Sequence, residues 1–187
     1  MPLSILRIFI SYCSDTDSLV ELARNIISEN NPRWEKSHHM TVRVLTFRDI
    51  MSTYHKRGTQ KYINDAILGK YDAYLGLMWT RFGRPTERFG SGTEEEYSEA
   101  VDNFLRLGRP EYVLFGFSEE KIRPSKIDVE QLAGVFDFRK RISINQLFFE
   151  WSDRKGFRDS VIRNMDEMVL GASKDPGRFV IGGTRYS

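Results

Sequence analysis

Several features that would identify a protein class at once are scarce in this chain. One cysteine, Cys13, stands among 187 residues, so no disulfide can form within the chain and a reducing cytoplasm is the simplest setting. No apolar stretch approaches the roughly 20 residues that a membrane-spanning helix needs. The apolar run at 3–10 is broken by Arg7 and has neither a basic leader nor a small-residue cleavage site, so we expect no signal peptide.

The common nucleotide-binding motifs are also missing. The chain contains neither the Gly-Lys-Ser/Thr phosphate loop nor the Gly-x-Gly-x-x-Gly turn, which disfavours a conventional NTPase or dehydrogenase. Its 28 basic and 26 acidic residues nearly balance, so we expect no direct binding of nucleic acid. The pair His38-His39 has no cysteine or acidic companion at metal-ligand spacing, and we predict no metal site.

Segments with strand-like and helix-like patterns alternate along the chain. This alternation predicts a doubly wound α/β fold with a parallel sheet in one domain, residues 1–170, and a glycine-rich tail or linker at 171–187. A capping box at Ser18 and Glu21 is expected to start the first helix. The expected strands are 5–10, 40–47, 71–79, 112–117 and 146–151, and apolar residues at helical spacing fall at 19–27, 63–67, 93–107, 129–136 and 157–169.

The segment 79–100 concentrates the residues that suggest chemistry. It follows the buried third strand and contains arginines, aromatic residues and glycines, and then a cluster of carboxylates opening a helix. Ligands of open α/β sheets bind outside the carboxyl ends of the strands. We therefore expect the functional site here.

A helical wheel of residues 93–108 separates the carboxylates from one another. Glu96 lies at the border of the apolar arc, about 20° from Leu107, whereas Glu95 and Glu99 point further away and are predicted to be solvated charges. The arc is expected to face the sheet and consists of Tyr97, Ala100, Val101, Phe104, Leu105 and Leu107.

Two readings of Glu96 follow from the spacing. In Thr93-Glu-Glu-Glu96 it would be the reciprocal partner of a capping box, a purely structural role. Ser91-Gly-Thr-Glu94 fits the same box, in which case Glu94 caps the helix and Glu96 is available for catalysis. The spacing alone leaves both open.

Three segments, taken together and in order, resemble the Toll/interleukin-1 receptor (TIR) superfamily. They are 8–12 (IFISY), 71–86 (YDAYLGLMWTRFGRPT) and 91–97 (SGTEEEY), and the likeness extends over roughly residues 5–170. The chain is most similar to bacterial TIR-like domains of antiphage defence and NLR-like proteins. The resemblance implies a flavodoxin-like fold of five parallel strands in the order 2-1-3-4-5.

The same resemblance implies cleavage of NAD+ between nicotinamide and ribose, with NAD+ as a substrate and no bound cofactor. The catalytic glutamate of such relatives lies on the helix after the central strands, and Glu96-Tyr97 aligns best with that position. The tryptophan and cysteine that precede this glutamate in many relatives are missing here, so Glu94 remains an alternative. Relatives act by self-association through TIR–TIR contacts, often with a fused or separate sensor module.

For such a substrate we expect aromatic side chains to hold the rings and cations to hold the diphosphate. Tyr12, Trp79 and Phe82 are the candidates for the rings, although core packing is the ordinary role of buried aromatic residues. Arg81 or Arg84 would bind the diphosphate. The substrate-binding set is completed by the segment ahead of the first helix, where backbone amides from 11–15 could hold phosphate and Ser11 and Cys13 lie beside Tyr12.

Two further interpretations stay open. The chain could be a non-catalytic TIR domain that acts only by self-association, or a nucleoside deoxyribosyltransferase-like enzyme, which shares the layout and uses a glutamate nucleophile. Cys13 has no clear histidine partner and is expected to be a buried or site-lining thiol. Arg88 is predicted to be a surface charge.

Overall fold

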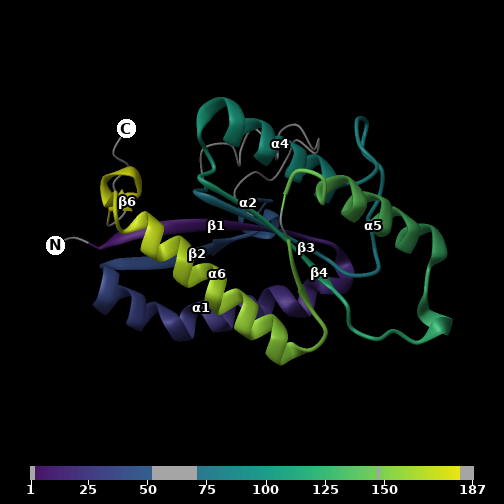
Figure 1. The fold of residues 1–187 in the computed structure, drawn as a ribbon, viewed down its shortest axis with the longest axis horizontal. Helices are drawn as coiled ribbons and strands as arrows, with labels where there is room; N and C mark the ends of the chain where they lie inside the picture. Colours follow the sequence, from purple (N-terminus) through teal and green to yellow (C-terminus); the bar gives the residue numbers. More distant parts are fainter. Residues whose placement is uncertain (1–2, 52–70, 147, 182–187) are drawn as a thin grey trace.

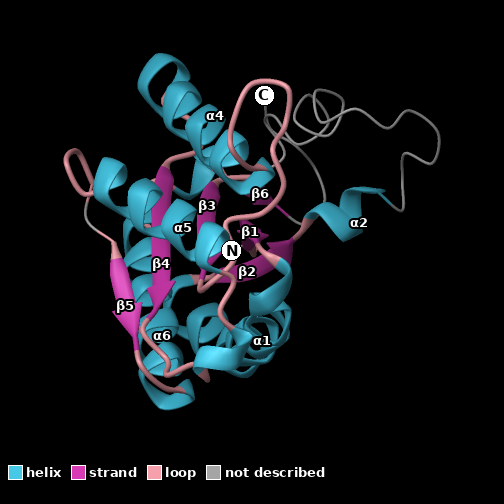
Figure 2. Ribbon diagram, turned by 90° about the vertical axis from the view of Figure 1, so that its right-hand side faces the viewer, coloured by secondary structure: helices cyan, strands magenta, loops and turns pink. Residues whose placement is uncertain are grey.

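The computed structural model describes residues 3–51, 71–146 and 148–181, and the structural statements below concern these residues. Five strands form a parallel sheet in the order β2-β1-β3-β4-β5 (Figures 1 and 2). This confirms the predicted α/β fold and its flavodoxin-like strand order. The strands are β1 (Ser4–Tyr12), β2 (Met40–Leu45), β3 (Ala73–Met78), β4 (Tyr112–Ser118) and β5 (Phe149–Trp151).

Helices cover both faces of the sheet (Figure 1). On one face, α1 (Asp17–His38) and α6 (Arg154–Ala172) bury a large apolar cluster against alternate residues of β1, among them Ile8 and Ile10. On the other, α4 (Gly92–Leu107) and α5 (Val129–Ile142) pack with Phe9 of the same strand. This alternation follows from the two-residue period of a strand. The remaining helical elements are η1 (Ser14–Thr16), α2 (Phe47–Met51), η2 (Pro124–Lys126) and η3 (Pro176–Arg178).

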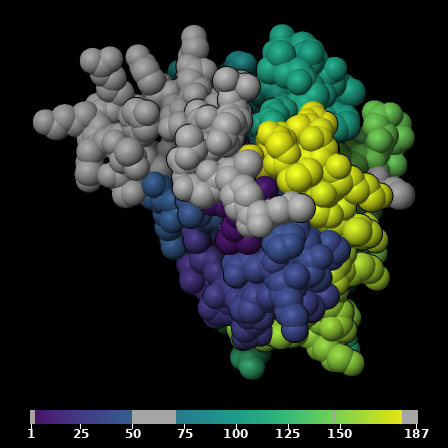
Figure 3. Space-filling view, turned by 90° about the vertical axis from the view of Figure 1, so that its left-hand side faces the viewer, coloured from purple at the N-terminus to yellow at the C-terminus, as the bar shows by residue number. Residues whose placement is uncertain are grey.

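Helices α1 and α6 pack against each other as well as against the sheet. Figure 3 shows the C-terminal part of the chain, in yellow, next to α1. Arg33 of α1 pairs with Asp166 of α6 at 2.6 Å, and the indole N–H of Trp34 donates to the same carboxylate at 2.6 Å. Because Trp34 is buried, its indole N–H cannot reach water, and this hydrogen bond gives it a partner inside the protein.

Part of the segment expected to be a tail joins the sheet. After α6 the chain forms β6 (Val180–Ile181), which pairs antiparallel with Ser4 and Ile5 at the start of β1. The side of β1 that β6 occupies is free there because β3 pairs only from Ile8 onward. The ordered fold therefore extends past residue 170.

One buried ion pair joins Arg7 of β1 to Asp72, the residue directly before β3. Asp72, just before β3, is 2% exposed and receives two hydrogen bonds of 2.9 Å from the Arg7 guanidinium and another of 2.9 Å from the Arg7 backbone N–H. A carboxylate can be held in a core when several charge-assisted hydrogen bonds replace water in this way. The pair joins β1 to the start of β3.

Several predicted boundaries differ from the structure. The second strand ends at Leu45, since the chain turns at Thr46 into α2, and only Phe149–Trp151 of the expected fifth strand pairs with β4. The capping box at Ser18 is wrong, because the 3₁₀ turn η1 leads directly into α1, whose N-cap is Thr16. The helix expected around 63–67 lies outside the described residues.

The predicted apolar face of α4 is only partly buried. Tyr97 and Ala100 pack in the core as expected, but Phe104, Leu105 and Leu107 are 43%, 74% and 63% exposed. The wheel assumed a sheet along the whole helix, whereas no residue of α4 after Asn103 is buried. Across the described ranges, no helix is both long enough and apolar enough to cross a membrane.

Replacing Asp72 by alanine tests the buried pair. The Asp72→Ala variant leaves the Arg7 guanidinium, 11% exposed, without its partner, and we expect a loss of about 3–5 kcal/mol in the free energy of unfolding. Urea denaturation followed by circular dichroism measures the change. Asp102→Ala, which removes the exposed pair to Arg106, is the control and should cost less than about 1 kcal/mol. Equal losses in the two variants would contradict a structural role for the pair.

Candidate active site

The start of α4 decides which glutamate caps the helix. The Ser91 hydroxyl accepts a hydrogen bond from the Glu94 backbone N–H at 3.1 Å, so Ser91 is the N-cap. The Glu94 carboxylate in turn accepts the Gly90 backbone N–H at 2.9 Å and pairs with Arg141 of α5 at 2.6 Å. Glu94 therefore has the structural role, and the box that places Glu96 at the cap is not formed.

Glu96 instead faces the sheet. Its carboxylate accepts a 2.5 Å hydrogen bond from the hydroxyl of Ser11, a residue that is 1% exposed near the carboxyl end of β1. Ser11 lies opposite Gly76 in the register between β1 and β3, so the contact is at the centre of the sheet. Glu96 itself is half-buried, and this hydrogen bond orients its carboxylate.

The negative charge of Glu96 acts on the buried tyrosines around it. Burial raises the pKa of Tyr74 well above its ordinary value, and the Glu96 charge raises it further. The pKa of Tyr71 is raised in the same way, by burial first and then by the charges of Glu96 and Glu99. Both phenols therefore stay neutral at physiological pH.

A cleft of about 760 Å³ opens next to Glu96. On one side lie the rings of Tyr12 and Phe47, whose centroids are 5.6 Å apart, with the Arg48 guanidinium 5.9 Å from each ring. The lining residues come from the end of β1 and the turn η1 that follows it, the start of α2, the loop after β3, and the starts of α4 and α5. They are Tyr12, Cys13, Ser14, Phe47, Arg81, Gly83, Arg84, Pro85, Thr86, Gly92, Thr93, Glu96, Asp128 and Gln131.

Two side chains hold the loop that carries the arginines. The Asp15 carboxylate accepts the backbone N–H groups of Thr80 and Arg81 at 2.8 and 2.9 Å and the Thr80 hydroxyl at 2.9 Å. The Gln131 side chain accepts the N–H groups of Phe82 and Gly83 at 3.0 and 2.9 Å and donates to the Gly83 carbonyl at 3.2 Å. The loop backbone is thus fixed, while the side chain of Arg81 extends from it at the rim of the cleft.

Two of the aromatic residues predicted to hold substrate rings do not line the cleft. The indole N–H of Trp79 donates to the Glu120 carbonyl at 3.2 Å, in the loop after β4. The Phe82 ring packs 6.0 Å from that of Phe138 and lies so close to Gly134 that an added Cβ there would be 2.8 Å from it. Phe82 therefore has the core-packing role, and of the three candidates only Tyr12 lines the cleft.

Sequence reasoning missed the aromatic partner of Tyr12. Phe47 stood at the end of the predicted second strand, next to the strand that ends in Tyr12, and the adjacency of these strands follows from the order 2-1-3-4-5. The placement of Phe47 on a neighbouring strand was therefore the signal in the sequence that could have identified it as the partner of Tyr12. The sequence contains no comparable signal for Gln131, because its position depends on how α5 packs against the loop after β3.

Two carboxylates predicted to be solvated are partly or wholly buried. Glu95 is 3% exposed and pairs with Arg88 at 2.5 Å, and Glu99 pairs with the same guanidinium at 2.6 Å. Arg88 folds back from the loop over the first turns of α4, and its single positive charge is shared between the two carboxylates. The helical wheel could not include Arg88 of the preceding loop, which pairs with Glu95 and Glu99.

Cys13 lies in the wall of the cleft as a buried thiol. It is 6% exposed, and its sulfur donates to the Phe82 carbonyl at 3.4 Å and lies 3.6 Å from the Thr93 hydroxyl. Burial raises the pKa of Cys13 to about 11, with a further contribution from nearby carboxylates. Such a thiol is protonated at physiological pH and is a poor nucleophile.

Comparison with protein-family models gives one finding. A model described as "Domain of unknown function (DUF4062)" matches residues 7–166, which include β2 to β5, most of β1 and α6, and every residue that lines the cleft. A search of the curated proteins found no match. The description of the family assigns no activity, so the chemistry has to be argued from the cleft.

The state of Cys13 can be measured by alkylation. At pH 8 a thiol with a pKa of about 11 has roughly a hundredth of the thiolate of one at the ordinary value of 9.0. We expect iodoacetamide to label the native protein at least about 100-fold more slowly than the urea-unfolded chain, with the native rate rising as pH approaches 11. Mass spectrometry follows the labelling. Equal rates for native and unfolded protein would indicate a reactive thiol instead.

Proposed function

The chain belongs to the DUF4062 family, and from the chemistry of its cleft we propose that it is an NAD+ glycohydrolase. The observation that carries the proposal is the carboxylate of Glu96, oriented by Ser11 beside a cleft at the carboxyl ends of β1 and β3. Cleavage between nicotinamide and ribose passes through an oxocarbenium-like state, which a fixed negative charge stabilises. Nicotinamide leaves as a neutral molecule, so the reaction needs no strong general acid.

The cleft supplies contacts suited to the rest of a dinucleotide. Its volume of about 760 Å³ lies within the range of sites that take ligands of this size. The rings of Tyr12 and Phe47 offer an aromatic surface for a base, and Arg81 and Arg84 offer guanidinium groups for a diphosphate. These two sets of residues lie on different elements around Glu96.

The resemblance to TIR domains supports the same assignment. The segment 8–12 that carries part of the resemblance supplies both Ser11 and Tyr12, and Glu96 is the residue that aligns with the glutamate of such relatives. We extend the proposal accordingly to a cytoplasmic effector of bacterial antiphage defence, activated by self-association and a fused or separate sensor module. The products are nicotinamide and ADP-ribose or a cyclic variant of it.

Neutralising Glu96 tests the proposal. The Glu96→Gln variant keeps the shape of the side chain and removes the charge, so we expect kcat for nicotinamide release to fall by at least about 100-fold. Glu87→Gln, an exposed carboxylate outside the cleft lining, is the matched control and should change kcat by less than about twofold. Chromatography of the products measures both rates, and circular dichroism verifies folding.

Three results would contradict the assignment in different ways. Full activity in Glu96→Gln would move the catalytic role to another residue. If NAD+ stays intact with wild-type protein under enforced oligomerisation, the result would favour the alternative that the chain is a non-catalytic interaction domain. Transfer of bases between deoxyribonucleosides, with NAD+ ignored, would identify a deoxyribosyltransferase-like enzyme.

Removing the hydroxyl of Ser11 tests its role as a positioning residue. In Ser11→Ala the carboxylate of Glu96 loses its 2.5 Å hydrogen bond, and we expect kcat to drop by about tenfold while KM changes little. A KM that rises by the same factor with unchanged kcat would show that Ser11 contacts the substrate rather than Glu96. Steady-state kinetics with NAD+ separates these outcomes.

A further inference from the structure

The sheet has an open stretch of edge at β4. Strand β5 is three residues long and pairs only with Gly116–Ser118, the last part of β4. Among the described residues, 112–115 have a strand neighbour on the β3 side alone. An unpaired edge offers backbone donors and acceptors to any extended chain that can reach it.

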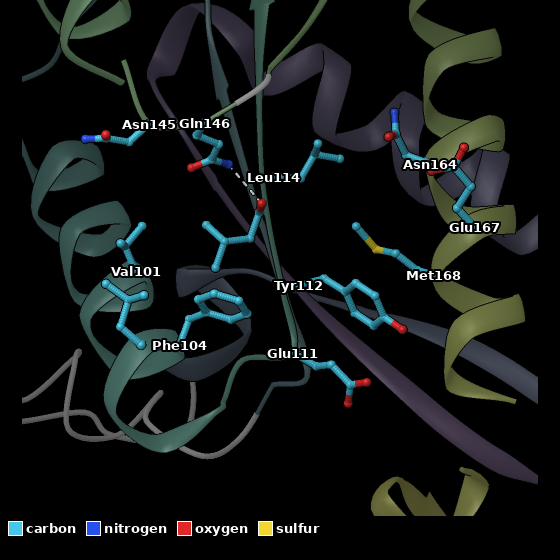
Figure 4. Close-up of a pocket in the computed structure, with 12 residues that line it drawn as sticks. Val101, Phe104, Glu111, Tyr112, Leu114, Asn145, Gln146, Asn164, Glu167 and Met168 are labelled. Carbon is cyan, nitrogen blue, oxygen red and sulfur yellow. Dashed lines mark hydrogen bonds between the residues drawn. The ribbon is translucent and has the colours of Figure 1, made fainter. Parts of the chain in front are cut away.

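A groove of about 530 Å³ runs along this stretch of edge. Figure 4 shows its two walls: Val101 and Phe104 of α4 lie on one side of β4, and Met168 of α6 faces Tyr112 on the other. Leu114 also lines the groove. The α4 wall is therefore apolar, whereas the α6 wall combines Met168 with the polar Asn164 and Glu167. The two walls stand on opposite faces of the strand edge, as a slot for one more strand requires.

The side chain of Gln146 occupies one hydrogen-bonding position along the edge. Its Nε2 donates to the Val113 carbonyl at 2.8 Å (Figure 4). Its Oε1 accepts a hydrogen bond from the hydroxyl of Tyr97. In a sheet the backbone N–H of the next strand would take this carbonyl. A side-chain amide meets the same need and can be exchanged for a backbone donor without leaving the carbonyl unsatisfied.

The charges at the groove select the kind of chain that fits. The lining includes the carboxylates Glu111 and Glu167 and no lysine or arginine. Glu111 is 3.7 Å from Arg178, which offsets part of its charge, whereas Glu167 is exposed and has no ion pair within the described part of the chain. A cationic side chain of a bound strand would meet Glu167, and an apolar one on the opposite face would meet the α4 wall.

We propose that this groove binds an extended segment of a partner protein, with alternating basic and apolar residues, which adds to the sheet as a strand beside residues 112–114. Main-chain hydrogen bonds would provide the binding and the alternate side chains the selectivity. The groove lies along the first half of β4, whereas the catalytic cleft lies at the carboxyl ends of the strands, so the proposal does not depend on the enzymatic activity.

Labelled hexapeptides test the proposal by fluorescence anisotropy on the intact chain. The probe is acetyl-Lys-Val-Lys-Val-Lys-Val-amide, and its controls are the same peptide with glutamate in place of lysine and a version with N-methylated backbone amides. We expect saturable binding of the probe and at least about tenfold weaker binding of each control. The first control tests the charge and the second tests the backbone pairing.

Three variants locate the binding. Glu167→Lys should weaken binding of the probe by at least about fivefold, whereas Glu130→Lys, an exposed charge reversal on α5 outside the groove, should change it by less than about twofold. Val101→Trp fills the groove from the α4 wall and should abolish binding, with the circular dichroism spectrum retained. Absence of saturable binding, or equal affinity for the N-methylated peptide, overturns the proposal. If the protein forms a dimer that Val101→Trp dissociates, and the peptide does not bind, the groove contacts a second copy of the chain, and this result also overturns the proposal.

Discussion

The hydrogen bond between Ser11 and Glu96 is the contact on which the architecture of the cleft depends. It joins β1 to the N-terminal part of α4, two parts of the chain that are 85 residues apart in sequence. Because Ser11 is buried, its hydroxyl has no contact with bulk water and donates its hydrogen bond to Glu96 instead. The carboxylate that accepts this bond belongs to a half-buried residue. The negative charge is therefore fixed at the mouth of the sheet rather than solvated like an ordinary surface glutamate.

The surrounding contacts keep that charge in place. Glu94 takes over the capping of α4 and ties the helix start to α5, so Glu96 is not drawn into the cap. Asp15 and Gln131 hold the loop after β3 from two sides, and with it the arginine at the rim of the cleft. A single sheet thus carries two distinct surfaces, a charged cleft at the carboxyl ends of its strands and a groove with an apolar α4 wall along the open edge of β4.

Sequence periodicity predicted the fold well because strands and helices bury residues with different repeats. Periodicity predicted the parallel sheet, the resemblance to TIR domains implied its strand order, and the spacing left open whether Glu96 lies in the cap of α4. The directions of Trp79 and Phe82 were not, since both are set by contacts with segments 41 and 49 to 56 residues away. The burial of Glu95 was missed for a related reason: Arg88 belongs to a loop, whose path no helical wheel contains.

Product analysis of wild-type protein with NAD+ tests the central claim most directly, because it depends on no substitution. Concentrated protein, incubated with NAD+ and analysed by mass spectrometry, should release nicotinamide in equal amount to ADP-ribose or its cyclic form. The same sample should leave a mixture of deoxyribonucleosides and free bases unchanged. NAD+ that stays intact at high protein concentration and under enforced oligomerisation would contradict the proposal that the Glu96 carboxylate serves glycosidic cleavage.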